Sequence, residues 1–295
     1  MIAADQPQSH EATATIDYEP HQYWESLLSG SFDSSGVAYA YLAVSFNDAL
    51  YRAERDVVRR ALDRHPSPVG PPTSALDIGC GTGIWIAFWR ALGVSEITGV
   101  DLTEAAIARL QNAGVPARLV QADIGDAKLD LGRKFDVVSA MSVLLHIVDT
   151  NRLACAVENL ARHLAPGGRL VLIEPVITQG WWGGELGPEA NSRVRTRDFW
   201  TAELDRHGLE LLEIRPVTFL LANPIDAQSK RIYQGWLRYW NFILRFIDRR
   251  ERVGAAAGRL LEWIDRPLRR SSHAGPSAKL LIVRHRDEPR DSAST

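Results

Sequence analysis

Short apolar, strand-like runs alternate with helical stretches between residues 75 and 175 of this chain. The strand-like runs cover residues 75–79, 96–101, 117–121, 135–140 and 170–175, and apolar residues at helical spacing cover 84–92, 103–113 and 151–164. A helix between two strands returns the chain to the start of a parallel neighbour, so this order predicts a doubly wound parallel sheet. Ligands of such sheets bind at the carboxyl ends of the strands, and we expect the functional site there.

The flanking segments extend this α/β pattern. Helical spacing predicts an N-terminal helical preface over residues 17–72, and a helix at 196–207, a strand at 211–220 and a last strand at 278–283 follow the alternation. We therefore predict a seven-stranded, doubly wound, Rossmann-like sheet over residues 73–286, with a helical insertion at 223–270 before the last strand. Residues 1–16 and 287–295 are polar and without periodicity, which predicts flexible tails.

The overall charge gives no sign of a polyanionic partner. The formal net charge is -2 and the sequence pI is near 6.5, so we expect a small-molecule substrate rather than a nucleic acid. Two cysteines cannot build a disulfide framework, the N-terminus lacks a signal-peptide pattern, and no run of about 18 apolar residues occurs. These features predict a cytoplasmic protein without a membrane span, and they leave a homodimer open.

A glycine-rich turn follows the first strand-like run. Residues 76–83 read Leu-Asp-Ile-Gly-Cys-Gly-Thr-Gly, so Gly79, Cys80, Gly81 and Gly83 let a ligand approach the backbone closely. The dinucleotide fingerprint places its third glycine one residue later, which counts against a nicotinamide oxidoreductase. Asp77 would repel a pyrophosphate and would attract an ammonium group such as that of S-adenosylmethionine (SAM).

Acidic residues mark the ends of the next two strand-like runs. Asp101 ends the second run, where a carboxylate can accept hydrogen bonds from both ribose hydroxyls of an adenosine. Asp123 follows the third run and is placed to contact an adenine amino group, while Leu102 and Ile124 would pack on the faces of the ring.

In these features the chain resembles the class I SAM-dependent methyltransferases, in particular bacterial small-molecule methyltransferases. The resemblance covers residues 74–176 and rests on the glycine motif, Asp101, Asp123, the segment 135–138 and a Pro-Gly-Gly turn at 166–168. It implies that SAM is the cofactor and that Met141, after the fourth strand, also contacts it. A protein that binds SAM without catalysis is the alternative outside enzyme chemistry.

Two polar residues are candidates for chemistry on the acceptor. His146 follows the fourth strand-like run and Glu174 ends the fifth, so both are expected at one cleft. A hydroxyl acceptor needs a base, and a histidine with a near-neutral pKa that a carboxylate orients would serve. Small-molecule O-methyltransferases that this chain resembles often use such a pair, which predicts O-methylation, with N- or C-methylation as alternatives. No cluster has metal-ligand spacing, so no metal is expected.

Tryptophans are the expected wall of the acceptor site. Trp181 and Trp182 lie between glycines after the fifth strand-like run, which suits a mobile lid, and Trp240 lies in the apolar insertion 223–270. Arginines recur every seven residues in this insertion, so one stripe can stay solvated while apolar side chains cover the rest. These apolar side chains can pack against the core, a second subunit, a membrane surface or the substrate. We predict that the insertion forms a partial cap over the methyl acceptor.

Overall fold

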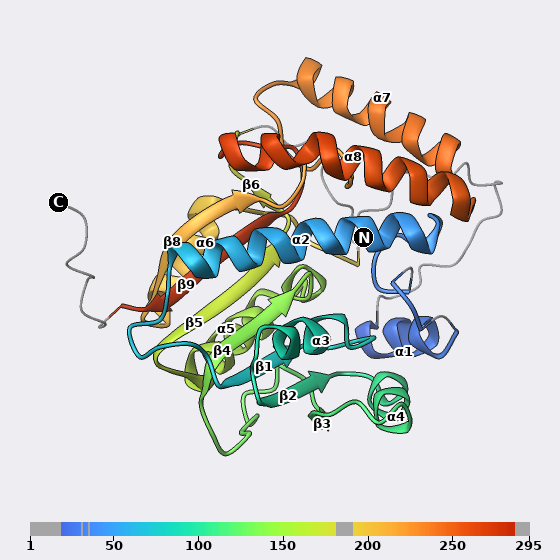
Figure 1. The fold of residues 1–295 in the computed structure, drawn as a ribbon. Coiled ribbons are helices and arrows are strands. Elements are labelled where there is room, and N and C mark those ends of the chain that lie inside the picture. The colour runs from blue at the N-terminus through green and yellow to red at the C-terminus, as the bar shows by residue number, and fades with distance from the viewer. Residues whose placement is uncertain (1–18, 31, 35, 181–190, 287–295) are drawn as a thin grey trace.

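A seven-stranded mixed sheet forms the centre of the molecule (Figure 1). The computed structural model describes residues 19–30, 32–34, 36–180 and 191–286 of the 295. Strands run in the order β3-β2-β1-β4-β5-β9-β8, and a separate two-stranded pair joins β6 to β7. Their bounds are β1 (Ser74–Ile78), β2 (Glu96–Asp101), β3 (Arg118–Gln121), β4 (Phe135–Met141), β5 (Leu164–Glu174), β6 (Val176–Ile177), β7 (Arg195–Thr196), β8 (Leu209–Pro216) and β9 (Lys279–His285). The predicted α/β fold with seven strands is confirmed.

One strand departs from the parallel arrangement. β1 to β5 pair in parallel, whereas β9 lies between β5 and β8 and runs antiparallel to both. Pro216, the last residue of β8, pairs with Lys279, the first residue of β9. The insertion therefore begins and ends at the same end of the sheet, so β9 runs in the direction opposite to β8. Strand pattern alone does not reveal this, because both directions need the same buried residues.

Helices cover both faces of the sheet. They are α1 (Pro20–Gly30), α2 (Val44–Arg64), α3 (Ile84–Ala91), α4 (Glu104–Asn112), α5 (Thr150–His163), α6 (Arg197–Arg206), α7 (Lys230–Ile247) and α8 (Glu251–Ser271), with a 3₁₀ turn, η1, at Leu144–His146. Side-chain oxygens cap four of the N-termini by accepting from a backbone N–H three residues on, which explains where these helices begin. The capping residues are Thr103, Asp149, Thr196 and Ser229.

Apolar residues alternate between two cores along each central strand. In β5, Leu170 and Leu172 face the core that α5 and α6 complete, whereas Val171 and Ile173 face the core that α2, α3 and α4 complete. Because both faces are covered, these strands are buried on both sides, as in other parallel sheets. The polar site is therefore confined to the ends of the strands.

The insertion between β8 and β9 consists of two helices that form an outer layer. α8 lies between α2 and α7 (Figure 1), and the helices are separated at Asp248, whose φ of 42° is incompatible with a continuing helix. Gly254 and Gly258 let α8 approach α2 closely, since a Cβ on either would lie within 3.0 Å of Ala43 or Ala49. Within the described residues, no helix is long and apolar enough to cross a membrane.

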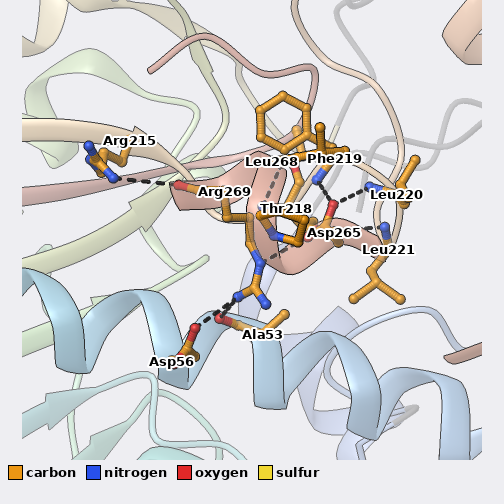
Figure 2. Close-up of polar contacts among 12 residues, drawn as sticks. Ala53, Asp56, Arg215, Thr218, Phe219, Leu220, Leu221, Asp265, Leu268 and Arg269 are labelled. Atoms are coloured by element: carbon orange, nitrogen blue, oxygen red, sulfur yellow. Dashed lines mark hydrogen bonds and ion pairs between the residues drawn. The ribbon is translucent and has the colours of Figure 1, made fainter. Parts of the chain in front are cut away.

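A buried ion pair fixes α8 to its neighbours (Figure 2). The carboxylate of Asp265 accepts hydrogen bonds from the backbone N–H of Phe219 at 2.6 Å and from the hydroxyl of Thr218 at 2.9 Å. It also pairs with the Nε of Arg269 at 3.0 Å, and Arg269 donates to the carbonyl of Ala53 in α2 at 2.8 Å. This network ties α8 both to α2 and to the loop that follows β8.

Candidate active site

The glycine turn is the floor of a cavity at the carboxyl ends of β1, β2 and β4. Gly79, Gly81 and Gly83 all have positive φ, which glycine adopts at little cost. A Cβ on Gly79 would come within 2.4 Å of the side chain of Val143, so no larger residue fits there. The turn thus brings the backbone of Gly79, Cys80 and Gly81 to the wall of the cavity.

This cavity, which we call the cofactor chamber, has a volume of about 530 Å³. α1 borders it on one side through Trp24 and Leu28, and the segment after β4 borders it on another. Nine of the residues predicted to bind the cofactor or to act in catalysis line it: Gly79, Cys80, Gly81, Asp101, Leu102, Asp123, Ile124, Met141 and His146. Asp77 and Gly83 lie outside its lining.

The three predicted acids have different surroundings. Asp77 is buried, and its Oδ1 accepts from the hydroxyl of Ser139 at 2.8 Å, while Oδ2 has no partner among the described residues. Burial, with the nearby charge of Asp101, raises the pKa of Asp77 to about 7. Asp101 accepts from the amide of Gly81 at 2.8 Å, and Asp123 pairs with Arg152. A polar group of a ligand at Asp77 would therefore replace a missing hydrogen bond.

His146 lines the cofactor chamber from η1. Its Nδ1 lies 2.8 Å from the carbonyl oxygen of Asn191, and a carbonyl only accepts, so Nδ1 carries the proton and Nε2 has the lone pair. The ring packs edge-on against Trp24, with 4.8 Å between the ring centroids. Burial lowers the pKa of His146 to about 3. The ring is therefore neutral near pH 7 and a weaker base than the sequence predicts.

Glu174 does not border the cleft, which corrects the sequence prediction. Its side chain is fully buried, and Oε1 accepts from the backbone N–H of Leu144 at 2.8 Å. Arg195 donates to the carbonyl of Leu144 at 3.2 Å and holds the same turn from its other side. Glu174 therefore positions the turn that carries His146, and the carbonyl of Asn191 rather than Glu174 orients the imidazole.

A second, smaller cavity adjoins the first. This acceptor chamber, of about 110 Å³, shares Trp24, Met141, Ser142 and His146, among others, with the cofactor chamber. Leu50, Tyr51 and Glu54 face it from α2, and Tyr39, Ala222 and Asn223 line it as well. The two chambers meet at the end of β4, where Ser142 adopts a φ of 59°. A positive φ outside glycine is a strained arrangement that recurs at functional sites.

Glu54 is the carboxylate of the acceptor chamber. It is 8% exposed, and no described residue donates a hydrogen bond to it. Burial raises its pKa to about 8, and the charge of Arg55 offsets only part of this shift. Tyr39 and Tyr51 line the same chamber, and the Tyr39 hydroxyl donates to Oδ1 of Asn223 at 2.5 Å. A cationic or hydrogen-bond-donating ligand group would relieve the cost of burying the Glu54 charge.

The comparisons with known proteins agree with this architecture. Residues 75–168 match a family model described as a methyltransferase domain. A solved SAM-dependent methyltransferase from Clostridium acetobutylicum superposes with a TM-score of 0.50 at 13% identity, covering 79% of this chain and 91% of that one, and so shares the fold. Residues 75–168 form a class I, Rossmann-like methyltransferase domain. SAM is the cofactor of this family.

Curated relatives of the methyltransferase domain differ in the atom that they methylate. The dTDP-3-amino-3,4,6-trideoxy-alpha-D-glucopyranose N,N-dimethyltransferase of Streptomyces venezuelae is 37% identical over 112 residues, 37% of this chain and 43% of that protein. A ubiquinone biosynthesis O-methyltransferase of Chromobacterium violaceum is 33% identical over 111 residues, 36% of this chain and 45% of that protein. The chain thus spans less than half the length of these two relatives.

Of the three tryptophans predicted to form the wall of the acceptor site, only Trp240 lies in the part of the chain that the structure describes, and it does not line the site. Trp240 is 1% exposed and packs against Tyr39 and Phe46, with ring centroids 5.1 and 6.5 Å apart, so it lies behind the acceptor chamber and lines neither cavity. Trp181 and Trp182 lie outside the described residues. Sequence reasoning missed Glu54 and Tyr51, although their spacing on one face of a predicted helix placed a carboxylate among apolar residues.

Proposed function

We propose that this protein transfers a methyl group from SAM to an amine of a small molecule. Asp77, Asp101 and Asp123 would hold the amino, ribose and adenine groups of the cofactor, which would pack against the glycine turn. When bound, SAM supplies a methyl group on a positively charged sulfur. The unpartnered Oδ2 of Asp77 suits a ligand that brings an ammonium group to this turn.

Glu54 is the observation that favours an amine as the methyl acceptor. A carboxylate buried without a hydrogen-bond donor costs stability unless a ligand supplies the donor or the positive charge. A protonated amine supplies both and binds beside Glu54, and a proton has to leave its nitrogen before attack. A bound ammonium group favours the charged form of Glu54, and this carboxylate can take the proton and pass it to water before attack, since its pKa of about 8 without a ligand is near that of an amine in solution. The amino sugars in the names of two relatives belong to this substrate class.

A hydroxyl acceptor, which the sequence predicts, is the second candidate. His146 favours it, because the imidazole lines both chambers and keeps an unprotonated Nε2. A hydroxyl holds its proton far more tightly than an ammonium group does, however, and a histidine with a pKa of about 3 is a weak base for removing it. The geometry therefore supports the amine better.

The test uses matched acceptors that differ in one atom. The protein is incubated with SAM and with an amino sugar nucleotide or the corresponding hydroxyl compound, and mass spectrometry records the addition of one methyl group. We expect methylation of the amine, and Glu54→Gln should lower kcat/KM by about 100-fold with an unchanged Kd for SAM, because one charged contact to the acceptor is lost. Glu158→Gln, at an exposed carboxylate of α5, is the matched control.

Each result has a distinct meaning. Methylation of the hydroxyl compound alone would replace the amine proposal with the hydroxyl one. A Glu54→Gln variant with normal kcat/KM toward the amine would show that Glu54 does not contact the acceptor. Absence of SAM binding by calorimetry would overturn the methyltransferase function itself.

A further inference from the structure

Large apolar side chains are exposed together on the outer helices. Among the described residues, those exposed by more than about a third are Val69 and seven residues of α7 and α8. Trp263 is the most exposed of them, at 73%, and Phe242 follows in the outer layer at 61%. We call these seven residues the α7–α8 apolar face: Ile232, Phe242, Phe246, Leu260, Trp263, Ile264 and Leu268.

The face is regular on each helix. Leu260, Trp263, Ile264 and Leu268 are spaced by three, four and eight residues from the first, so they share one side of α8. Phe242 and Phe246 on α7 stack with 5.8 Å between ring centroids and 11° between planes. The opposite side of each helix is buried. Its buried residues include Trp240, Ile243 and Ile247 in α7 and Gly254, Gly258 and Asp265 in α8. The core is thus already satisfied without the apolar face.

Basic residues are concentrated on the same two helices. Residues 230–271 contain eleven Lys and Arg and four Asp and Glu, a net charge of +7, while the rest of the chain carries -9. The overall charge of -2 hides this asymmetry. Arginines recur every seven residues along one stripe beside the exposed apolar residues of each helix, and no described carboxylate pairs with the three on α7. These arginines are 231, 238 and 245 in α7 and 252, 259 and 266 in α8.

We propose that the α7–α8 apolar face docks on the surface of an anionic lipid bilayer. Helices that lie in a membrane interface combine Phe, Trp and Leu on one face with Arg and Lys beside it, and bury the apolar side by roughly 5–10 Å. The long arginine side chains reach lipid phosphates from the margins of such a face. Because α7 is the outermost helix and α8 lies next to it (Figure 1), both can lie flat on one surface.

Charge decides against a second copy of the chain. A symmetric dimer would bring the same patch of both subunits together, and here the arginine stripes beside the two apolar faces would oppose each other. A nucleic acid would satisfy the arginines, but it would leave the apolar residues between them without a partner. An anionic bilayer satisfies both.

The test is vesicle co-sedimentation of the full chain at low salt. We expect binding to vesicles of equal parts phosphatidylcholine and phosphatidylglycerol, and much weaker binding to phosphatidylcholine alone. The double variant Phe242→Ser/Trp263→Ser should lower the partition coefficient at least about tenfold, because two inserted side chains are lost. The triple variant Arg231→Gln/Arg238→Gln/Arg245→Gln should do the same and should also weaken the salt dependence.

Matched controls separate the face from general surface properties. Val69→Ser removes an exposed apolar residue elsewhere, and Arg59→Gln/Arg193→Gln/Arg197→Gln removes three exposed arginines outside the two helices. Both controls should bind like the wild type, and circular dichroism checks that every variant is folded. Equal vesicle binding by all variants would overturn the proposal. So would a dimer in light scattering that Trp263→Ser dissociates, or nucleic-acid binding without vesicle binding.

Discussion

Replacing Glu54 by Gln should stabilise the protein in the absence of ligands, by an amount that rises with pH. The side chain keeps its shape and loses a charge that burial makes costly. Burial raises the pKa of Glu54 from 4.5 to about 8, and at about 1.4 kcal/mol per pH unit this difference corresponds to an upper limit of about 5 kcal/mol. Because the folded-state pKa is the higher one, the wild type has its full stability below pH 4.5 and loses it as the pH rises through about 8.

Urea denaturation at pH 5 and pH 9 measures this difference. At pH 5 the two proteins should differ by about 1 kcal/mol or less, and at pH 9 the variant should be more stable by roughly 2–5 kcal/mol. Glu158→Gln, at an exposed carboxylate, should show no such pH dependence. A Glu54→Gln variant with the same stability difference at both pH values would show that the charge of Glu54 is solvated or paired, and the argument for an amine acceptor would lose its basis.

Three further predictions concern the cofactor, the imidazole and the buried ion pair. Asp101→Ala should weaken SAM binding in calorimetry by roughly 1.5–3 kcal/mol, since charged hydrogen bonds are lost, and an unchanged Kd would contradict the cofactor assignment. His146→Ala should lower kcat by less than about tenfold for an amine and by about 100-fold or more for a hydroxyl, and stopped assays with both acceptors compare the two. Asp265→Ala should lower the free energy of unfolding by roughly 2–4 kcal/mol, because Thr218 and Phe219 lose their acceptor and Arg269 keeps only the longer ion pair with Asp56, whereas Glu158→Ala should cost about 0.5 kcal/mol or less. Similar losses for these last two variants would show that the Asp265 pair is open to water.

The fold and the cofactor chamber were predictable because their signals are local. Strand and helix periods are visible over short windows, and the glycine turn with Asp101 and Asp123 combines positions that each follow the end of a strand. Parallel strands bring their carboxyl ends to one edge, so residues far apart in sequence could be grouped without coordinates. Nine of these residues do line one cavity.

The acceptor chamber was not predictable because its walls come from unrelated segments. α2, the turn after β4 and the loop around Asn223 are far apart in the sequence and meet only in the folded chain. The sequence correctly predicts that Glu174 ends a strand and that Trp240 lies on an apolar helix. Glu174 instead accepts a hydrogen bond from the backbone of Leu144, and Trp240 packs against Tyr39 in the core. Side-chain direction at a strand end depends on such contacts and not on sequence position.

The position of Glu54 also bears on the proposed transfer to nitrogen rather than to oxygen. An amine that gains a methyl group gains a positive charge, so positive charge moves toward the chamber that holds this buried carboxylate. A charge pair in a buried setting is several-fold stronger than in water. Glu54, charged again once the amine's proton has passed to water, would therefore stabilise the methylated nitrogen as it forms. A hydroxyl that has lost its proton ends as a neutral ether and draws no such benefit, and its negative oxygen would be repelled by Glu54 beforehand. Under the proposed function, the same carboxylate that destabilises the unliganded fold at high pH would select for the acceptor whose product is a cation.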